Sequence, residues 1–398
     1  MPPACEGTAG RPRPRVSCFG YPVRGHTVPS LPVIAELTRR GVEVDCHSSP
    51  AFAPAIAGAG ARFVAYPAES EALLTTPVDS AEHLARSLAA TEALLPALLQ
   101  PGRPPPALVL FDASALWGGI LARCWQRPAV ASITTFAMNR TLLQLTHAPE
   151  PAAWSVPIRE RLNVRYGAGF HDHRDLMTPK ADLKLVYTSR AFQPAGRFFD
   201  RSHLFLGPLL NQRVREGATI RATGSRPLAY VSLGTLFNQD QALLRRIGTL
   251  LAARGWQVVV SLGDAQARHD GDWPEHVQAH AFVDQVGVLA QADLFVTHGG
   301  MNSVSEALAQ AVPMVVIPQA VDQHLVARQT ANLGAAVVID RDAVSTESLA
   351  AALDRFDAGR TGFQAAASRL QASFTDVLTV ADAVDQMLAL LQDTSAHA

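Results

Sequence analysis

Short β-branched segments alternate with Ala/Leu-rich helical stretches along most of the 398-residue chain. A strand, a helix and another strand, repeated, form βαβ units, which build a mostly parallel sheet covered by helices. The alternation occurs in two series, so the sequence predicts two doubly wound α/β halves. The expected strands are 15–20, 42–48, 62–67, 107–112, 129–134 and 183–189 in the first series, and 228–234, 256–263, 276–283, 294–300, 313–318 and 335–339 in the second.

The segment between the two series has the composition of an interdomain linker. Residues 207–227, "GPLLNQRVREGATIRATGSRP", are rich in glycine and charge and lack periodic apolar positions, which puts a boundary near residue 215. The stretch 136–180 shows no strand period and is expected to be an insertion over the cleft. The expected divisions are a disordered tail at 1–14, an N-terminal domain at 15–212, a C-terminal domain at 213–375 and a C-terminal helix at 376–398 that could pack back on the N-terminal domain.

Charge and hydropathy exclude several classes of protein. The net charge of −1 provides no electrostatic footprint for a nucleic acid or an anionic membrane. The N-terminus lacks the apolar region of a secretory signal, and Pro313 and Pro318 interrupt the longest uncharged stretch, so we expect no stable membrane insertion and a cytoplasmic location. The four cysteines show no CxxC spacing, which indicates neither a zinc site nor a disulfide framework. A homodimer is compatible with this composition.

The segment "THGGMNS" (297–303) has the pattern of an anion site. His298 ends an apolar strand, Gly299 and Gly300 permit a tight turn, and Asn302 and Ser303 open a helix. Free backbone N–H groups and the positive end of the helix dipole suit a phosphate there, and the side chains of His298 and Ser303 add hydrogen-bond donors. Alternatively, the glycines form only a turn and His298 is a hydrogen-bonded strand-end histidine.

Three further polar residues follow in an order that suits a sugar. Glu306 lies one turn into the same helix, where its carboxylate could accept from ribose hydroxyls. Asp322 and Gln323 follow the next strand and offer the acceptor and donor groups that sugar hydroxyls require. The alternative is a capping box in which Ser303 and Glu306 only satisfy backbone N–H groups at the helix start.

Two residues of the first half could carry acid–base chemistry. His26 lies at the end of a Gly/Pro loop after the first strand, and an imidazole with a pKa near ~6.5 can take a proton from a hydroxyl group at neutral pH. Asp112 ends the strand "ALVLFD" and should reach the same rim, where a carboxylate would orient that base. Alternatively, His26 is a surface histidine and Asp112 an ordinary helix N-cap.

The ordered set H-G-G-x-N-S-x-x-E and D-Q, together with G-H-x-x-P-x-L at 25–31, resembles the signatures of the family 1 glycosyltransferases, the UDP-glycosyltransferase superfamily. It is most similar to the bacterial macrolide and natural-product members. The resemblance spans most of the chain and is strongest from 228 to 340. It implies a GT-B fold, in which two doubly wound, Rossmann-like domains face each other across a cleft.

The resemblance also implies a role for each matching residue. His26 would be the catalytic base and Asp112 its partner. In "FVDQ" (282–285), Asp284 stands where the family usually has proline. The implied donor-binding residues are His298, Gly300, Asn302 and Ser303 at the diphosphate, Glu306 at the ribose, Asp322 and Gln323 at the hexose, Phe282, Val283 and Gln285 at the uracil, and Ser232, Gly234 and Thr235 of "YVSLGT" closing on the phosphates.

These features together predict an inverting O-glycosyltransferase. The expected donor is UDP-glucose, used as a co-substrate with no other cofactor, and the expected acceptor is a small apolar natural product such as a macrolide, another polyketide or a phenol, in antibiotic biosynthesis or resistance. No metal is expected, since "HDGD" (269–272) has the setting of a polar loop. The alternatives are a dTDP-deoxysugar-dependent transferase and a UDP-sugar 2-epimerase on the same architecture. A nicotinamide oxidoreductase would need a G-x-G-x-x-G turn, which neither candidate loop supplies.

Overall fold

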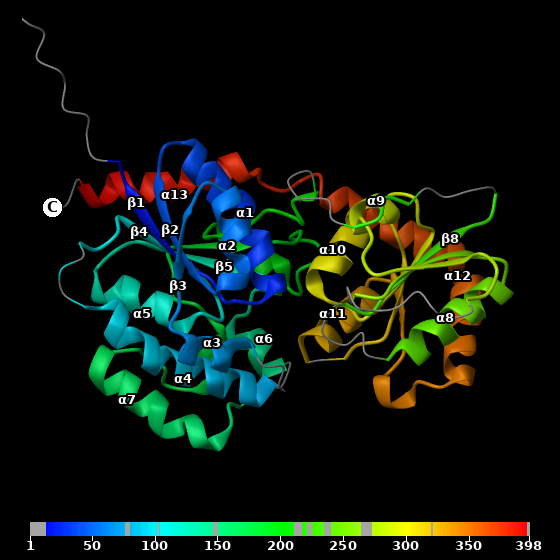
Figure 1. Ribbon diagram of the computed structural model, residues 1–398, viewed down its shortest axis with the longest axis horizontal. Helices are drawn as coiled ribbons and strands as arrows, with labels where there is room; N and C mark the ends of the chain where they lie inside the picture. Colours follow the sequence, from blue (N-terminus) through cyan, green and yellow to red (C-terminus); the bar gives the residue numbers. More distant parts are fainter. Residues whose placement is uncertain are drawn as a thin grey trace, which may run out of the picture.

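Two α/β halves lie side by side in the computed structural model, and each is built on one parallel sheet (Figure 1). Residues 1–12 of the expected tail, 211–216 around the expected boundary, Thr235 and the "HDGD" loop lie outside the described part of the chain. The structure describes residues 13–75, 80–100, 102, 104–145, 150–210, 217–220, 225–234, 240–263, 273–319 and 321–395.

The N-terminal half contains a seven-stranded sheet in the order β3-β2-β1-β4-β5-β6-β7, with every neighbouring pair parallel. The central strands β4 and β5 are buried along their whole length, as strands covered by helices on both faces must be. The sequence analysis missed the edge strand β7, which is three residues long. The strands are β1 Arg15–Phe19, β2 Glu43–Ser48, β3 Arg62–Ala65, β4 Leu108–Asp112, β5 Ala129–Ile133, β6 Leu183–Val186 and β7 His203–Phe205.

The helices of this half cover both faces of its sheet (Figure 1). Phe136 of the 136–180 segment is buried in the core cluster of the C-terminal half, so the expected insertion at the junction of the halves is wrong only for helix α7. It packs on α4, and its buried residues Ile158 and Leu162 join the core under that helix. The helices are α1 Arg24–Arg39, α2 Ala53–Gly58, α3 Ala68–Thr75, α4 Ser80–Leu98, α5 Leu116–Cys124, α6 Arg140–Leu145 and α7 Val156–Tyr166, with short 3₁₀ turns at Pro50–Phe52, Ala153–Ser155, His173–Met177 and Gly196–Phe198.

The C-terminal half contains a six-stranded parallel sheet in the order β10-β9-β8-β11-β12-β13. Strand β10 is shorter than expected and stops at His280, which leaves residues 281–284 as a loop. The strands are β8 Leu228–Ser232, β9 Gln257–Ser261, β10 Val277–His280, β11 Leu294–Thr297, β12 Met314–Val316 and β13 Ala336–Val338. The helices are α8 Gln241–Ala253, α9 Gln285–Leu289, α10 Met301–Ala309, α11 Val321–Asn332, α12 Thr346–Ser373 and α13 Val380–Ser395, with a 3₁₀ turn at Arg341–Ala343.

The last helix, α13, leaves the C-terminal half and runs back along the N-terminal half, where it contacts α1 (Figure 1). Val384 and Met387 of α13 are fully buried in the same apolar cluster as Val33 and Leu37 of α1. Removing these side chains from water attaches the end of the chain to the first half, because burial of each large apolar side chain contributes about 1.5–3 kcal/mol.

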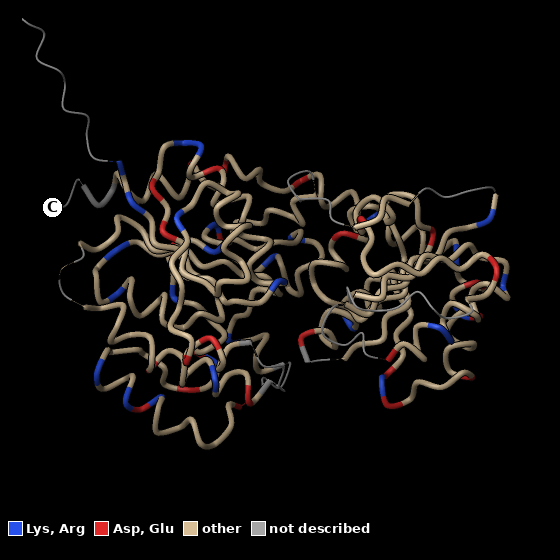
Figure 2. Tube along the Cα trace, viewed as in Figure 1, with Lys and Arg blue, Asp and Glu red and all other residues tan. Residues whose placement is uncertain are grey.

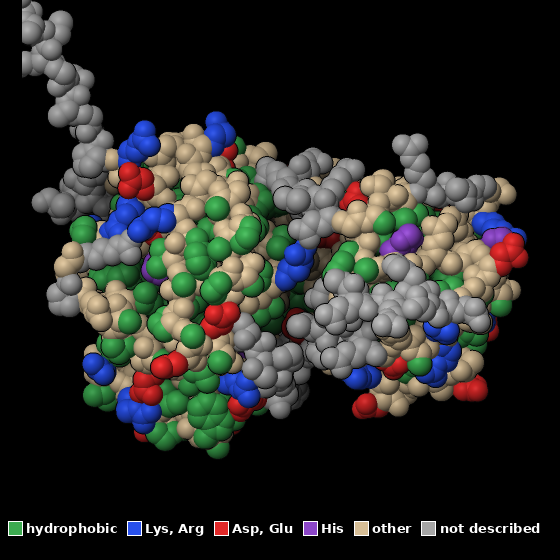
Figure 3. All heavy atoms as spheres, viewed as in Figure 1, with side chains coloured by type: hydrophobic (Ala, Val, Ile, Leu, Met, Phe, Trp, Pro, Cys, Tyr) green, Lys and Arg blue, Asp and Glu red, His purple; other side chains and the backbone are tan. Residues whose placement is uncertain are grey.

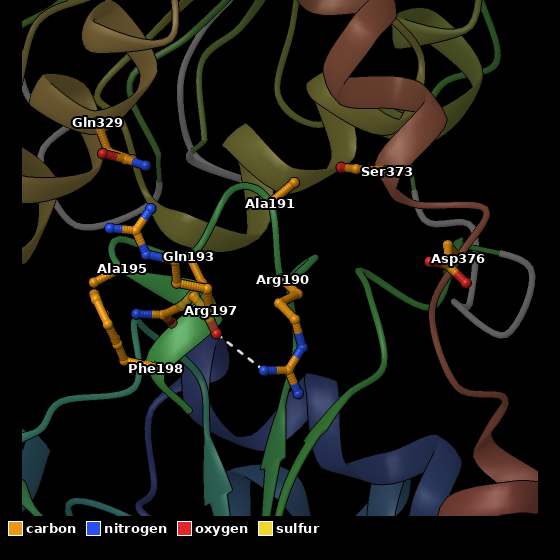
Figure 4. A pocket seen from close by; sticks show the side chains of 10 residues that line it. Arg190, Ala191, Gln193, Ala195, Arg197, Phe198, Gln329, Ser373 and Asp376 are labelled. Carbon is orange, nitrogen blue, oxygen red and sulfur yellow. Dashed lines mark hydrogen bonds between the residues drawn. The ribbon is translucent and has the colours of Figure 1, made fainter. Parts of the chain in front are cut away.

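The two halves also meet around a cavity of about 650 Å³ (Figure 4). Hydrogen bonds beside it join the halves: Gln329 Nε2 donates to Phe192 O at 3.0 Å, and the hydroxyls of Ser189 and Ser373 lie 2.7 Å apart. The walls of the cavity are thus part of the contact between the halves. Its lining includes Arg190, Gln193, Arg197, Phe198, Gln329, Ser373 and Asp376.

Charged residues of both signs are scattered along the trace of the two halves (Figure 2), and apolar and charged groups are interspersed on the face drawn in Figure 3. This agrees with the net charge of −1. In the described part of the chain, no helix is both long enough and apolar enough to cross a membrane.

Candidate active site

The imidazole of His26 and the carboxylate of Asp112 meet at the carboxyl edge of the first sheet. His26 lies in the first turn of α1, directly after β1, and Asp112 is the last residue of β4, the neighbour of β1. His26 Nδ1 lies 3.0 Å from both carboxylate oxygens of Asp112 and 3.1 Å from Thr134 Oγ1. Asp112 Oδ1 also accepts from the Ser114 backbone N–H at 2.8 Å, so the carboxylate is held from two sides.

The surroundings of His26 favour its protonated form. Burial opposes the charge and is the largest single influence, but the carboxylates of Asp112 and Asp322 and the hydrogen bond to Asp112 outweigh it and raise the pKa of His26 above its ordinary value. Asp322, the more weakly contributing carboxylate, belongs to the other half. His26 retains an accessible side, since 22% of its side chain is exposed.

Two aromatic neighbours of His26 were missed by the sequence analysis. The ring of Tyr21 lies 5.2 Å from that of His26 and 5.1 Å from that of His83, and the Tyr21 hydroxyl is 3.3 Å from His83 Nδ1. Burial lowers the pKa of His83 to about 4, so this second imidazole is neutral at pH 7. Tyr21 lies in the loop just before the helix of His26 and could have been identified from the sequence, whereas His83 lies on α4, far from His26 in the sequence.

The predicted anion site forms at the start of α10. Gly299 adopts φ +87°, in the left-handed region that favours glycine, and Gly300 is the N-cap, without a side-chain cap. The imidazole of His298 fits beside two glycines: a Cβ added to Gly300 would lie 2.7 Å from His298 Nε2, and one added to Gly234 would lie 2.9 Å from it. These positions need glycine because real Cβ atoms do not approach a ring so closely.

His298 is a neutral donor rather than a cation in this setting. Burial lowers its pKa to about 4, and a backbone group of Ser232 opposes that shift only in part. A neutral imidazole can still donate one hydrogen bond to an anion. Attraction of a diphosphate here would therefore depend on N–H groups and the dipole of α10, and not on a charged histidine.

The capping-box alternative for Ser303 and Glu306 is wrong. Both residues lie inside α10 and bond to Gln285, the first residue of α9. Gln285 Nε2 donates to Ser303 Oγ at 3.1 Å and to Glu306 Oε2 at 2.6 Å, and its Oε1 accepts from the hydroxyl of Tyr230 at 3.2 Å. Glu306 is only 1% exposed, so its carboxylate lies behind the Gln285 amide. The sequence analysis did not single out Tyr230.

The loop 281–284 holds Phe282 outward. Phe282 is 42% exposed, whereas Val283 is buried and faces the core. Asp284, at the position where the family usually has proline, caps α9 by accepting from Gly287 N at 3.2 Å. The linker residue Ala218 pairs with this loop, because its N–H donates to Phe282 O and its carbonyl accepts from Asp284 N, both at 3.0 Å. The departure from proline is thus accommodated by a helix cap and a short strand pair.

The remaining predicted residues lie at strand and helix ends that face the same region. Ser232 ends β8, and Asp322 and Gln323 lie in the first turn of α11, with Asp322 exposed and Gln323 buried. Asn302 Nδ2 donates to Gly25 O at 3.0 Å, which joins the start of α10 directly to the first turn of α1, one residue before His26. The two groups of predicted residues, one in each half, therefore meet across the junction of the halves.

The arrangement of two parallel-sheet halves is similar to that of solved natural-product glycosyltransferases. The structure of the kitacinnamycin glycotransferase is 29% identical, with a TM-score of 0.79, over 96% of this chain and 100% of that one. The structure of CalG4, the calicheamicin glycosyltransferase, is 26% identical, with a TM-score of 0.81, over 96% and 99%. The fold is therefore that of a GT-B glycosyltransferase.

Sequence comparison gives the family. Residues 245–390 match the profile described as "Erythromycin biosynthesis protein CIII-like, C-terminal domain". The NDP-glycosyltransferase YjiC of Bacillus licheniformis is 30% identical over 86% of this chain and 89% of that protein. The oleandomycin glycosyltransferase of Streptomyces antibioticus is 32% identical over 81% and 78%. The chain belongs to the family 1 glycosyltransferases and is an enzyme of the macrolide and natural-product type.

Proposed function

We propose that this enzyme is an inverting O-glycosyltransferase that transfers glucose from UDP-glucose to a hydroxyl of a small apolar natural product, with His26 as the general base. The observation that carries the proposal is the pair of 3.0 Å contacts between His26 Nδ1 and the Asp112 carboxylate. With Nδ1–H donating to Asp112, the lone pair of Nε2 is left to accept a proton. This is the tautomer that a base for an acceptor hydroxyl requires.

The reaction is a single displacement at the anomeric carbon. The proton of the acceptor hydroxyl passes to Nε2 of His26 as the oxygen attacks that carbon. The bond to the diphosphate oxygen breaks with its electron pair, and UDP leaves, so an α-linked donor gives a β-glycoside. Asp112 stabilises the imidazolium that results, and N–H groups at the start of α10 face the charge that develops on the diphosphate.

The donor would occupy the C-terminal half. The exposed ring of Phe282 offers a surface on which a nucleobase can stack. Ser232, Gly234 and Thr235 would close on the phosphates opposite His298 and Ser303. Glu306 would serve the ribose, and Asp322 and Gln323 the hydroxyls of the hexose.

The choice of glucose depends on the pair Asp322 and Gln323. A carboxylate and an amide together accept from and donate to adjacent hydroxyls, which a hexose that keeps its 3- and 4-hydroxyls provides. A deoxysugar would lack one of the two hydroxyls that this pair could bind.

The test is calorimetric titration of the purified protein with UDP, UDP-glucose, dTDP and NAD, without added metal, followed by turnover of UDP-glucose with a panel of phenols and macrolides. We expect UDP and UDP-glucose to bind and a glucoside of inverted configuration to form. Preference for dTDP and faster turnover of a dTDP-deoxysugar would mean that the donor is a dTDP-deoxysugar, while the type of reaction would stay as proposed. Binding of NAD alone would refute the proposal, and conversion of the UDP-sugar to its 2-epimer without an acceptor would mean an epimerase.

A further inference from the structure

A partly buried hydrogen-bonded chain lies behind the proposed ribose position. It runs from Tyr230 on β8 through Gln285 at the start of α9 to Ser303 and Glu306 on α10. Three elements that are distant in sequence are thus joined by three side-chain bonds of 3.2, 3.1 and 2.6 Å. Gln285 is the centre of the chain, since each of the other residues bonds to its amide.

The hydroxyl of Tyr230 has a fixed position. Tyr230 is 1% exposed, and its ring stacks on that of Phe295 with centroids 4.9 Å apart and an interplanar angle of 9°. Burial raises the pKa of Tyr230 above its ordinary value, so the hydroxyl keeps its proton and can donate. A tyrosine this deeply buried cannot touch a bound donor and can act only through the residues that it contacts.

The two ends of the Gln285 amide are held by different partners. The carboxylate of Glu306 requires a donor and therefore selects Nε2, whereas the hydroxyl of Tyr230 holds Oε1. The amide is consequently fixed in one rotational position. Without the hydroxyl, the amide would be held at its nitrogen alone and could swing with the carboxylate.

We infer that Tyr230 is a positioning residue for ribose recognition: its hydroxyl and the buried Glu306 carboxylate hold the Gln285 amide, whose Oε1 keeps a lone pair for a ribose hydroxyl rather than for the uracil edge that the resemblance implies. This inference depends on the proposed use of a uridine donor. It also gives the site a physical means of preferring a ribonucleotide to a 2′-deoxyribonucleotide, because the 2′-hydroxyl has partners that cannot move away.

The experiment measures calorimetric affinities for UDP and 2′-deoxy-UDP in the wild type and in Tyr230→Phe, which keeps the ring stack and removes only the hydroxyl. We expect the wild type to prefer UDP. In the variant we expect the affinity for UDP to fall about tenfold, as for one lost hydrogen bond in a charged network, and that for 2′-deoxy-UDP to change much less. Tyr187→Phe is the matched control, since that buried tyrosine bonds to Ser132 at 3.2 Å in the other half.

A double-mutant cycle with Gln285→Met separates positioning from stability. If Tyr230 acts through Gln285, the double variant binds UDP no more weakly than Gln285→Met alone. Additive losses, or equal weakening of UDP and 2′-deoxy-UDP in Tyr230→Phe, would overturn the inference and leave Tyr230 a core residue. A wild type that binds UDP without preferring it to 2′-deoxy-UDP would also overturn it. A wild type that binds no UDP would refute the proposed function, and the inference with it.

Discussion

At the scale of single residues, His26 is held from several sides. Asp112 and Thr134 contact its Nδ1, and the ring of Tyr21 lies against its face. These contacts leave the imidazole one orientation, with Nε2 free for an acceptor hydroxyl. A base that is fixed in this way loses little entropy when the acceptor binds.

Replacing His26 by alanine is expected to remove nearly all turnover, by about 10²–10⁴-fold, because a positioned general base contributes that much. Donor affinity should stay the same, since the donor-binding residues lie in the other half. The control is His203→Ala, which removes a histidine that also bonds to an aspartate, His203 Nδ1 to Asp200 Oδ1 at 3.0 Å, away from the cleft. Turnover near that of the wild type in His26→Ala would exclude His26 as the base.

The pH dependence follows from the raised pKa of His26. A base acts in its neutral form, so kcat/KM should fall as the pH drops through a pKa above the ordinary ~6.5 of histidine. Asp112→Asn removes the neighbouring charge, which lowers that pKa and moves the acid limb of the profile to lower pH, with a lower plateau. Profiles of the two proteins with the same acceptor check this. If the acid limb were unchanged in Asp112→Asn, the fall in kcat/KM at low pH would not be due to protonation of His26.

At the scale of elements, helix α13 stabilises the half to which it returns. Met387 is fully buried beside α1, and its replacement by alanine leaves a cavity, which costs about 2–5 kcal/mol in the free energy of unfolding. Urea unfolding followed by fluorescence measures this. The matched control is Ala389→Ser on the exposed side of the same helix, which should change the free energy by less than about 0.5 kcal/mol. Equal effects of the two changes would contradict the packing of α13 on α1.

At the scale of the whole molecule, the donor should be bound without a metal ion. The N–H groups of α10 and the neutral side chains around them are expected to meet the charge of the diphosphate. EDTA should therefore leave turnover of UDP-glucose unchanged and added Mg²⁺ should not raise it. Loss of turnover in EDTA that Mg²⁺ restores would refute this prediction.

UDP should also raise the stability of the whole protein. A ligand present at 100 times its Kd stabilises the folded state by about 2.7 kcal/mol. Thermal unfolding with and without UDP measures the shift, and NAD at the same concentration is the control.

Much of this fold was predictable from local pattern. Alternating strand and helix periods, the turn chemistry of Gly299 and Gly300, and polar residues at strand ends are properties of neighbouring residues. The sequence by itself therefore determined two α/β halves and which candidate residues lie at strand and helix ends. His26 and Asp112 could be paired although they are 86 positions apart, because each follows a strand of one parallel sheet. The edge strand β7 was missed because three residues show no period.

Only the tertiary structure decided which side chains touch. Tyr230 and Gln285 are 55 positions apart, and Tyr21 and His83 are 62 positions apart. No local sequence pattern predicts either contact. Ser303 and Glu306 bond to Gln285 instead of forming a local capping box. Helix α7 packs on α4 rather than at the junction of the halves. Such choices depend on the sum of many contacts among distant elements, which one stretch of sequence does not contain.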